Sequence, residues 1–152
     1  MAHTRIWIHA VWATKNHSRF LDEILRRNLF SHIRENADEK GIEINFINGI
    51  SDHVHCLLRL KADQNIAKVI QMIKGESSRW INLNKLTKGK FAWAVEYFAG
   101  SVSASAVDTV RDYIGNQEQH HRKRTFSEEY DLLLERYGLK PIGEGDGSYT
   151  PD

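Results

Sequence analysis

The sequence predicts an α+β fold in which helices pack against an antiparallel sheet. Four segments carry the apolar alternation or short apolar run of a β-strand, and longer segments between and after them carry apolar residues at helical spacing. Their order along the chain is strand, helix, strand, strand, helix, strand, helix. Two strand–helix–strand halves in this order are typical of the ferredoxin-like split βαβ arrangement. This arrangement packs its helices on one face of the sheet, so the other face is expected to be available for a site or a partner chain.

The first strand and the first helix are expected near the N-terminus. Residues 4–14 place apolar side chains on both faces of an alternating segment, which predicts a strand. Residues 21–40 place leucine and isoleucine at helical spacing, which predicts a helix with one apolar side. Gly41 follows as an expected C-terminal cap, because glycine readily adopts the left-handed conformation that ends many helices.

A hairpin is expected next. Residues 42–47 and residues 53–60 both have the composition of strands. Asn48-Gly49 between them is a strong turn signal, because both residue types tolerate positive φ angles. We therefore expect these two strands to pair directly, with the turn at Asn48-Gly49.

A second helix and a fourth strand follow the hairpin. Apolar residues at helical spacing run from Ile66 to Ile81, with Gly75 as a weak point inside the helix. Residues 85–90 are basic and polar, which predicts a loop. Residues 91–99 have the composition of a strand.

Two further helices are expected after the fourth strand. Ser105 with Asp108, and Thr125 with Glu128, both resemble capping boxes, in which side chains bind the free amides at a helix start. The first pair predicts a helix that runs to about residue 122. The second pair predicts a shorter final helix.

The composition is that of a single globular domain. The chain has 152 residues, of which 41% are hydrophobic and 27% charged, and this is enough to bury a sizeable core. No segment has the apolar length of a membrane span, and the N-terminus lacks the layout of a secretory signal. The single cysteine, Cys56, excludes an internal disulfide and is expected in the core. We therefore expect a cytoplasmic domain over residues 1–142 and a mobile tail over residues 143–152.

Charge is unevenly distributed along the chain, although the formal net charge is only +1. Residues 66–95 carry six lysines and arginines against one acidic residue, whereas residues 128–152 carry seven acidic residues against two basic ones. A basic middle favours a phosphate-binding face. A solvated helix face would give the same pattern.

Two histidines flank one hydrophobic residue at the start of the strand over residues 53–60. Because side chains alternate along a strand, His53 and His55 are expected on the same face. Two adjacent imidazoles can chelate a divalent metal ion. The pair alone is a weak metal signal, since histidines on a half-buried strand can instead bind backbone or water.

The helix that runs to about residue 122 brings a phenol beside an amide. Val107, Val110 and Ile114 form an apolar stripe that is expected to pack on the sheet. Tyr113 and Gln117, four residues apart, lie together at the edge of that stripe. A tyrosine can attack a phosphodiester when a metal ion polarises the phosphate, and the amide oxygen could join the two histidines as a ligand. A ligand set of this kind suits Mg²⁺ or Mn²⁺ better than a structural zinc. The alternative is an ordinary boundary tyrosine beside an exposed glutamine.

Taken together, these motifs resemble those of the HUH single-tyrosine transposases of bacterial insertion sequences, named after a histidine–hydrophobic–histidine motif. The resemblance covers about residues 4–139. The matching segments are Asp52-His53-Val54-His55, Tyr113-Ile-Gly-Asn-Gln117, Glu118-Gln-His-His-Arg122, and Phe91-Ala-Trp93 followed by Ser101-Val-Ser103. Each motif is short, and their joint occurrence in this order is much more specific than any one alone.

The resemblance implies an enzyme that cuts and rejoins single-stranded DNA at the ends of an insertion sequence and recognises imperfect hairpins there. Tyr113 would be the nucleophile on a C-terminal catalytic helix, forming a 5′-phosphotyrosine and leaving a free 3′-hydroxyl. His53, His55 and Gln117 would be the ligands of Mg²⁺ or Mn²⁺. The partners implied are single-stranded DNA with hairpin ends and a second copy of the chain. In such a homodimer, the tyrosine helix can complete the site of the partner subunit.

The basic middle of the chain would then contact the DNA backbone, since phosphate contacts position a nucleic acid without specifying its sequence. The six candidate DNA-binding residues are Lys68, Lys74, Arg79, Lys85, Lys88 and Lys90. Trp80, Trp93 and Tyr97 could stack on extruded bases, although Trp80 is more consistent with the core. His120 and His121 could equally contact phosphate or stabilise a helix C-terminus.

Two other functions remain open from the sequence. A domesticated HUH nuclease that acts on palindromic repeats in the genome would carry the same residues. A non-enzymatic protein that binds single-stranded nucleic acid on the ferredoxin-like scaffold would need neither a metal ion nor a reactive tyrosine.

Overall fold

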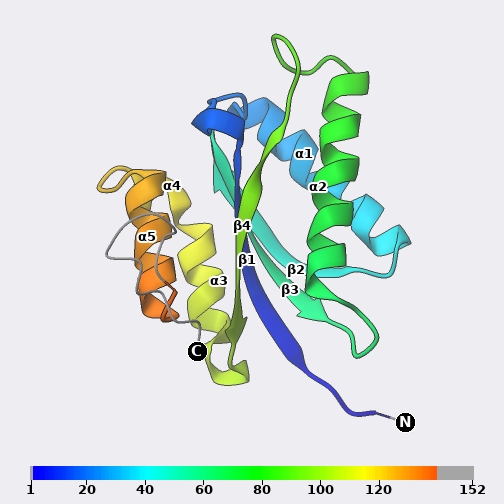
Figure 1. Ribbon diagram of the computed structural model, residues 1–152, viewed down its shortest axis with the longest axis vertical. Coiled ribbons are helices and arrows are strands. Elements are labelled where there is room, and N and C mark those ends of the chain that lie inside the picture. The colour runs from blue at the N-terminus through cyan, green and yellow to red at the C-terminus, as the bar shows by residue number, and fades with distance from the viewer. Residues whose placement is uncertain (1, 140–152) are drawn as a thin grey trace.

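A four-stranded antiparallel sheet forms the centre of the molecule. In the computed structural model, which describes residues 2–139, the strand order is β2-β3-β1-β4 (Figure 1). The strands are β1 (Ile6–Thr14), β2 (Glu43–Ile50), β3 (His53–Leu60) and β4 (Trp93–Val102). The predicted α+β class and antiparallel sheet are therefore confirmed. The tail expected over residues 143–152 lies outside the described residues.

Two helices cover one face of the sheet. These are α1 (Glu23–Glu39) and α2 (Ile66–Leu83), which lie side by side in Figure 1. Their apolar sides and the even-numbered residues of β1 and β3 form the largest core cluster, which includes Trp12, Cys56 and Ile70. Gly41 follows α1 with a φ of 73°, so the expected glycine cap is confirmed.

Three shorter helices cover the opposite face. They are α3 (Val107–Gly115), α4 (Gln117–His121) and α5 (Phe126–Arg136). The odd-numbered residues of β1 and β3 pack against them in two smaller clusters, with Leu57 against α3 and Val11 against α5. The face that we expected to be available for a site is thus covered by helices of the same chain, and any site there lies between sheet and helices.

The prediction of a turn at Asn48-Gly49 is wrong. Both residues belong to β2, and the chain turns at Ser51-Asp52 instead. The glycine is needed for a different reason. A Cβ on Gly49 would lie 2.2 Å from the backbone oxygen of His53, so only glycine permits the close approach of β2 to the start of β3.

The helix expected from about residue 105 to residue 122 is interrupted. It begins at Val107 without a side-chain cap, so the predicted Ser105–Asp108 capping box is not formed. The chain leaves helical geometry at Asn116, whose φ and ψ are −101° and 26°, and α4 starts at the next residue. The second capping box, between Thr125 and Glu128 at the start of α5, is confirmed.

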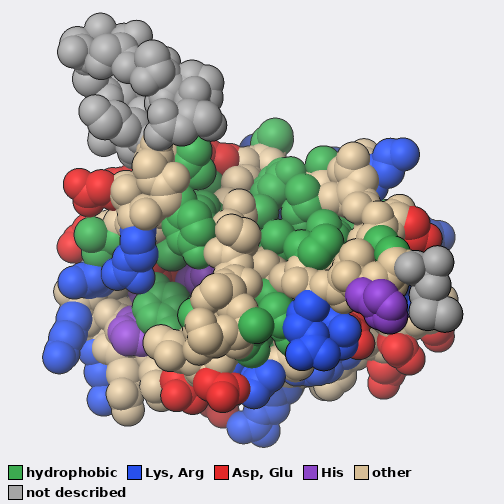
Figure 2. All heavy atoms as spheres, turned by 90° about the horizontal axis from the view of Figure 1, so that it is seen from below, with side chains coloured by type: hydrophobic (Ala, Val, Ile, Leu, Met, Phe, Trp, Pro, Cys, Tyr) green, Lys and Arg blue, Asp and Glu red, His purple; other side chains and the backbone are tan. Residues whose placement is uncertain are grey.

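The molecular surface at the end of the sheet where β1 begins carries charges of both signs. Figure 2 shows cationic and acidic side chains interspersed around a central area of hydrophobic side chains at this end. A surface of this kind lacks the single sign of charge that attracts a polyanion. Among residues 2–139, no helix combines the length and the apolar character that are required to cross a bilayer.

Candidate active site

The two histidines of β3 lie on the face of the sheet that α3, α4 and α5 cover. The side chains of His53 and His55 are both fully buried. His53 Nδ1 donates a hydrogen bond of 2.8 Å to Asp52 Oδ1. Because this bond holds the hydrogen on Nδ1, it orients the ring so that Nε2 points between sheet and helices.

His55 is held by a third histidine that lies on β1. His9 Nε2 and His55 Nδ1 are 2.9 Å apart and share a hydrogen bond, and the two rings are stacked. Burial lowers the pKa of His9 to about 3 and that of His55 to about 4, so both rings are neutral at physiological pH. The sequence analysis assigned no role to His9. The available signal was its odd-numbered position in β1, which places it on the same face as His53 and His55.

Gln117, the first residue of α4, reaches the histidine pair from the helical layer. Its side chain is fully buried, and its Oε1 lies 3.2 Å from His53 Nε2. Its amide nitrogen donates a hydrogen bond of 3.4 Å to the carbonyl oxygen of Tyr113. The break at Asn116 therefore leaves the tyrosine and the glutamine adjacent, although they lie on two different helices.

A carboxylate from α5 lies at the centre of this cluster. Glu129 Oε1 accepts a hydrogen bond of 2.7 Å from His55 Nε2 and lies 3.5 Å from His53 Nε2. No motif in the sequence predicted a role for this residue. Glu129 falls on the apolar side of α5, between Phe126 and Leu133, and a charged residue in such a stripe was the signal that could have found it.

The electrostatics of the cluster favour a carboxylate anion beside a protonated or metal-bound imidazole. Burial alone would raise the pKa of Glu129, but the imidazoles of His121, His53 and His55 beside it outweigh burial and hold the pKa far below its usual range. Burial alone would lower the pKa of His53, but the bond to Asp52 and the Glu129 carboxylate raise it above its usual value. The site is thus built to hold positive charge next to Glu129.

Tyr113 lies beside the histidines within the same chain. Its ring centroid is 5.8 Å from that of His55, 6.1 Å from that of His9 and 4.6 Å from that of His120. Burial and the nearby Glu129 carboxylate raise the pKa of the phenol above its ordinary value. A cation next to this carboxylate would oppose that effect.

Residues 2–117 match the profile of the family described as IS200-like transposases. The chain belongs to this family. The matched residues include the two histidines of β3, Tyr113 and Gln117, so the resemblance to HUH tyrosine transposases that the motifs indicated is confirmed. Glu129 and the rest of α5 lie beyond the matched segment.

Three proteins to which this chain is similar are named as transposases. The ISDra2 transposase TnpA of Deinococcus radiodurans is 26% identical over 114 residues, which are 72% of this chain and 81% of that protein. A crystal structure from the same species, of a protein assigned as a transposase, has a TM-score of 0.62 at 26% identity and covers 76% of this chain and 93% of that chain. The structure of a REP-associated tyrosine transposase bound to a REP hairpin has a TM-score of 0.60 at 18% identity and covers 100% of this chain and 95% of that chain. At that identity, the last likeness shows the fold alone.

The donor atoms of this transposase cluster fit a divalent cation. His53, His55 and Glu129 each offer one ligand atom, and the three atoms lie within 4.8 Å of one another. Gln117 Oε1 adds a fourth donor beside them. Imidazole nitrogens together with carboxylate and amide oxygens form a set that binds divalent metal ions, and the bond from Asp52 orients one imidazole.

The six predicted DNA-binding residues are not part of this cluster. They lie on α2 and on the loop that follows it, which belong to the other helical layer. The ammonium group of Lys74 donates hydrogen bonds to the carbonyl oxygens of Ala94 and Val95, at 2.6 and 3.2 Å. Burial lowers the pKa of this lysine. The structure therefore brings together the four residues expected to catalyse the reaction and bind the metal, but places the expected DNA-binding residues elsewhere.

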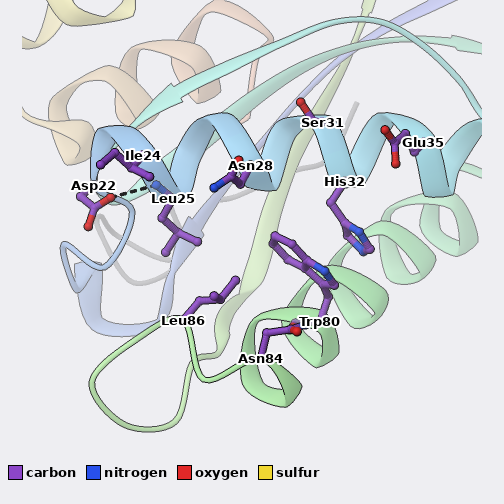
Figure 3. A pocket seen from close by; sticks show the side chains of 10 residues that line it. All are labelled: Asp22, Ile24, Leu25, Asn28, Ser31, His32, Glu35, Trp80, Asn84 and Leu86. Atoms are coloured by element: carbon purple, nitrogen blue, oxygen red, sulfur yellow. Dashed lines mark hydrogen bonds between the residues drawn. The ribbon is translucent and has the colours of Figure 1, made fainter.

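A groove of about 530 Å³ lies between α1 and α2, on the layer opposite the histidine cluster. Figure 3 shows Trp80 pointing from α2 toward α1, beside His32. The two rings are stacked with centroids 4.2 Å apart, and the tryptophan packs against the main core as expected. Trp93 is also buried, and its indole nitrogen donates to Ser77, so the suggestion that it stacks on DNA bases is wrong.

Proposed function

We propose that this transposase cleaves and rejoins single-stranded DNA by transesterification, with Tyr113 as the nucleophile. The observation that carries the proposal is the position of Tyr113 next to the buried His53–His55 pair and Gln117 within one chain. A non-enzymatic nucleic-acid-binding protein would have no reason to bury two imidazoles and a carboxylate together beside a half-buried phenol, because the desolvation of such groups is costly.

The proposed reaction exchanges one phosphate ester for another. The Tyr113 oxygen forms a bond to phosphorus and loses its proton, while the bond from phosphorus to the 3′ oxygen breaks and that oxygen leaves as a hydroxyl. The products are a 5′-phosphotyrosine and a free 3′-hydroxyl. Attack by a 3′-hydroxyl on the phosphotyrosine reverses the step and rejoins strands without ATP, because the ester bond is conserved.

Different residues of the chain would bind the metal ion and orient its ligands. We propose that His53, His55, Gln117 and Glu129 hold a Mg²⁺ or Mn²⁺ ion, which would polarise the phosphate and stabilise its developing charge. Asp52 and His9 orient the two imidazoles. The surrounding helices exclude water from the cluster, which strengthens each of these electrostatic interactions.

The proposed substrate is single-stranded DNA that carries a hairpin. The related transposase whose structure holds a REP hairpin supports this choice through its shared fold. Ends of an insertion sequence and palindromic repeats in a genome both supply such DNA. Cleavage assays with each of the two substrates distinguish a mobile enzyme from a domesticated one.

The predicted homodimer with composite sites remains a proposal. In this structure, Tyr113 lies beside the histidines of its own chain, so one chain already brings together the proposed nucleophile and the proposed metal ligands. A dimer would exchange equivalent helices between two copies. Mixing a Tyr113→Phe variant with a His53→Ala variant tests it, since activity returns only if the site can be completed between subunits.

The experiment that tests the function is a covalent-adduct assay. We expect the protein, incubated with single-stranded DNA from palindromic element ends and Mn²⁺, to form a DNA adduct that survives denaturation. EDTA, Tyr113→Phe and the double variant His53→Ala, His55→Ala should each abolish the adduct, while Tyr137→Phe serves as the control. An adduct that persists in Tyr113→Phe or in EDTA contradicts the proposal.

A further inference from the structure

A second groove lies directly against the candidate active site, and the proposed function does not use it. Its volume is about 480 Å³. It is formed by the segment that joins α4 to α5, by the turn between β2 and β3, and by Arg19, which precedes α1. Three consecutive cations, Arg122, Lys123 and Arg124, line it from the α4–α5 segment.

These cations are available for a ligand. Arg19, Arg122, Lys123 and Arg124 are all exposed, and none of them forms an ion pair within residues 2–139. The two carboxylates that line the same groove are already engaged. Asp52 accepts the hydrogen bond from His53, and Glu128 closes the capping box of α5. With four cations against two carboxylates, the groove therefore carries an excess of positive charge.

The groove is continuous with the metal-ligand cluster. Three of its lining residues, Asp52, His121 and Phe126, surround His53. The ring centroids of His121 and Phe126 are 4.5 and 4.3 Å from that of His53. The side chain of His121 is only 9% exposed, and its Nε2 lies 3.4 Å from Glu129 Oε2 without an aligned hydrogen bond. The backbone of a DNA strand that extends from the active site on this side would therefore lie directly in the groove.

From this arrangement we infer that the groove binds the backbone phosphates of the single strand on one side of the scissile bond. The inference rests on the proposed function for the identity of the strand. Charge complementarity supports a polyanion, and continuity with His53 supports a strand that is threaded through the site rather than one bound elsewhere. The contacts are electrostatic and independent of sequence. The lysines of α2, in the opposite layer, do not lie along this path.

The test measures DNA binding in EDTA, so it does not depend on cleavage. The probe is a fluorescent oligothymidylate of about 20 nucleotides, long enough to fill an extended binding groove. The variant is Arg122→Gln, Lys123→Gln, Arg124→Gln. The matched control removes the same charge from the exposed face of α1 and from the residue that caps its end, with Arg27→Gln, Arg34→Gln, Lys40→Gln. Fluorescence anisotropy gives the dissociation constant at several salt concentrations, and circular dichroism checks the fold.

We expect the groove variant to bind on the order of 100-fold more weakly at about 0.1 M salt, because each lost phosphate contact removes roughly a fivefold factor there. The slope of log K against log salt should fall by about 2, since three contacts contribute roughly 0.7 each on single strands. The control should keep the wild-type slope. Arg122→Lys, Arg124→Lys, which retains the charge, should also keep it.

Two results would overturn the inference: an unchanged slope in the groove variant, or an equal loss of slope in the control. The outcome is separate from that of the adduct assay. If the groove variant loses binding as expected but Tyr113→Phe still forms the adduct, the groove stands and the catalytic proposal fails. If Tyr113→Phe abolishes the adduct while the groove variant binds normally, only the groove inference fails.

Discussion

At the scale of single residues, each imidazole of β3 is held by a partner outside the set of four donor side chains. His9 is the clearest case. No role was predicted for it from the sequence, but in the structure it forms a hydrogen bond with the buried Nδ1 of His55. Sequence spacing could place the two histidines of β3 on one face. It could not show which neighbour across the sheet fixes their ring nitrogens, since that depends on the register between β1 and β3.

Replacing His9 should weaken metal binding without removing a ligand. His9→Ala leaves His55 Nδ1 without its partner, and the loss of such a partner typically lowers metal affinity 10- to 100-fold. His9→Gln, whose amide can still form the bond, should recover part of this loss. Calorimetric titration with Mn²⁺ measures both. A folded His9→Ala variant with wild-type affinity would show that His9 has no positioning role.

The thiol of Cys56 should be unreactive in the native protein. The side chain is fully buried, and burial raises the pKa of the thiol to about 12, so almost no thiolate exists at neutral pH. We expect a thiol reagent to label the protein only after denaturant is added. Rapid stoichiometric labelling of the folded protein would contradict the described position of β3.

At the scale of elements, the order of strands and helices was predictable because apolar periodicity records which faces are buried. The connections were less predictable. Asn48-Gly49 has the composition of a turn but serves as extended strand, because the glycine is required by a close backbone approach. The interruption at Asn116 also has no clear signal in the sequence. It places Gln117 at the start of a separate helix.

Two glycine substitutions test this interpretation of β2. Gly49→Ala should destabilise the fold by about 1–3 kcal/mol, because the new Cβ would meet backbone atoms of β3 that cannot move independently. Gly75→Ala, within α2, should stabilise it by about 0.4–1 kcal/mol, because alanine lowers the conformational entropy of the unfolded chain. The added Cβ meets no atom within 4 Å, so no clash opposes this gain. Urea denaturation measures both. Equal effects at the two positions would contradict the assigned strand register.

The helix α5, which lies beyond the residues matched by the family, carries the proposed metal ligand Glu129. Glu129→Gln keeps the size of the side chain but removes the negative charge beside His53 and His55. We expect affinity for Mn²⁺ to fall at least about tenfold, which is the lower end of the effect seen when the surroundings of a metal are changed. Glu135→Gln, an exposed carboxylate on the same helix, is the control. Equal affinities of the two variants would exclude Glu129 as a ligand.

At the scale of the whole molecule, the sheet separates the main apolar core from the layer that holds the candidate active site. The main core lies under α1 and α2, whereas the buried polar groups lie under α3, α4 and α5. The charge pattern of the sequence pointed to α2 because its cations are numerous. The candidate active site instead lies in the helical layer that covers His53 and His55. Which layer covers them is a property of the folded chain and cannot be read from local composition.

The central claim is that Tyr113 forms the covalent bond to DNA. It is tested most directly by proteolysis of the adduct formed with Mn²⁺, followed by mass spectrometry of the DNA-linked peptide. The account predicts one modified peptide with the phosphate on Tyr113, joined to the 5′ end of the released strand, and a free 3′-hydroxyl on the other fragment. Linkage to another residue, or a 3′-phosphotyrosine, would contradict it.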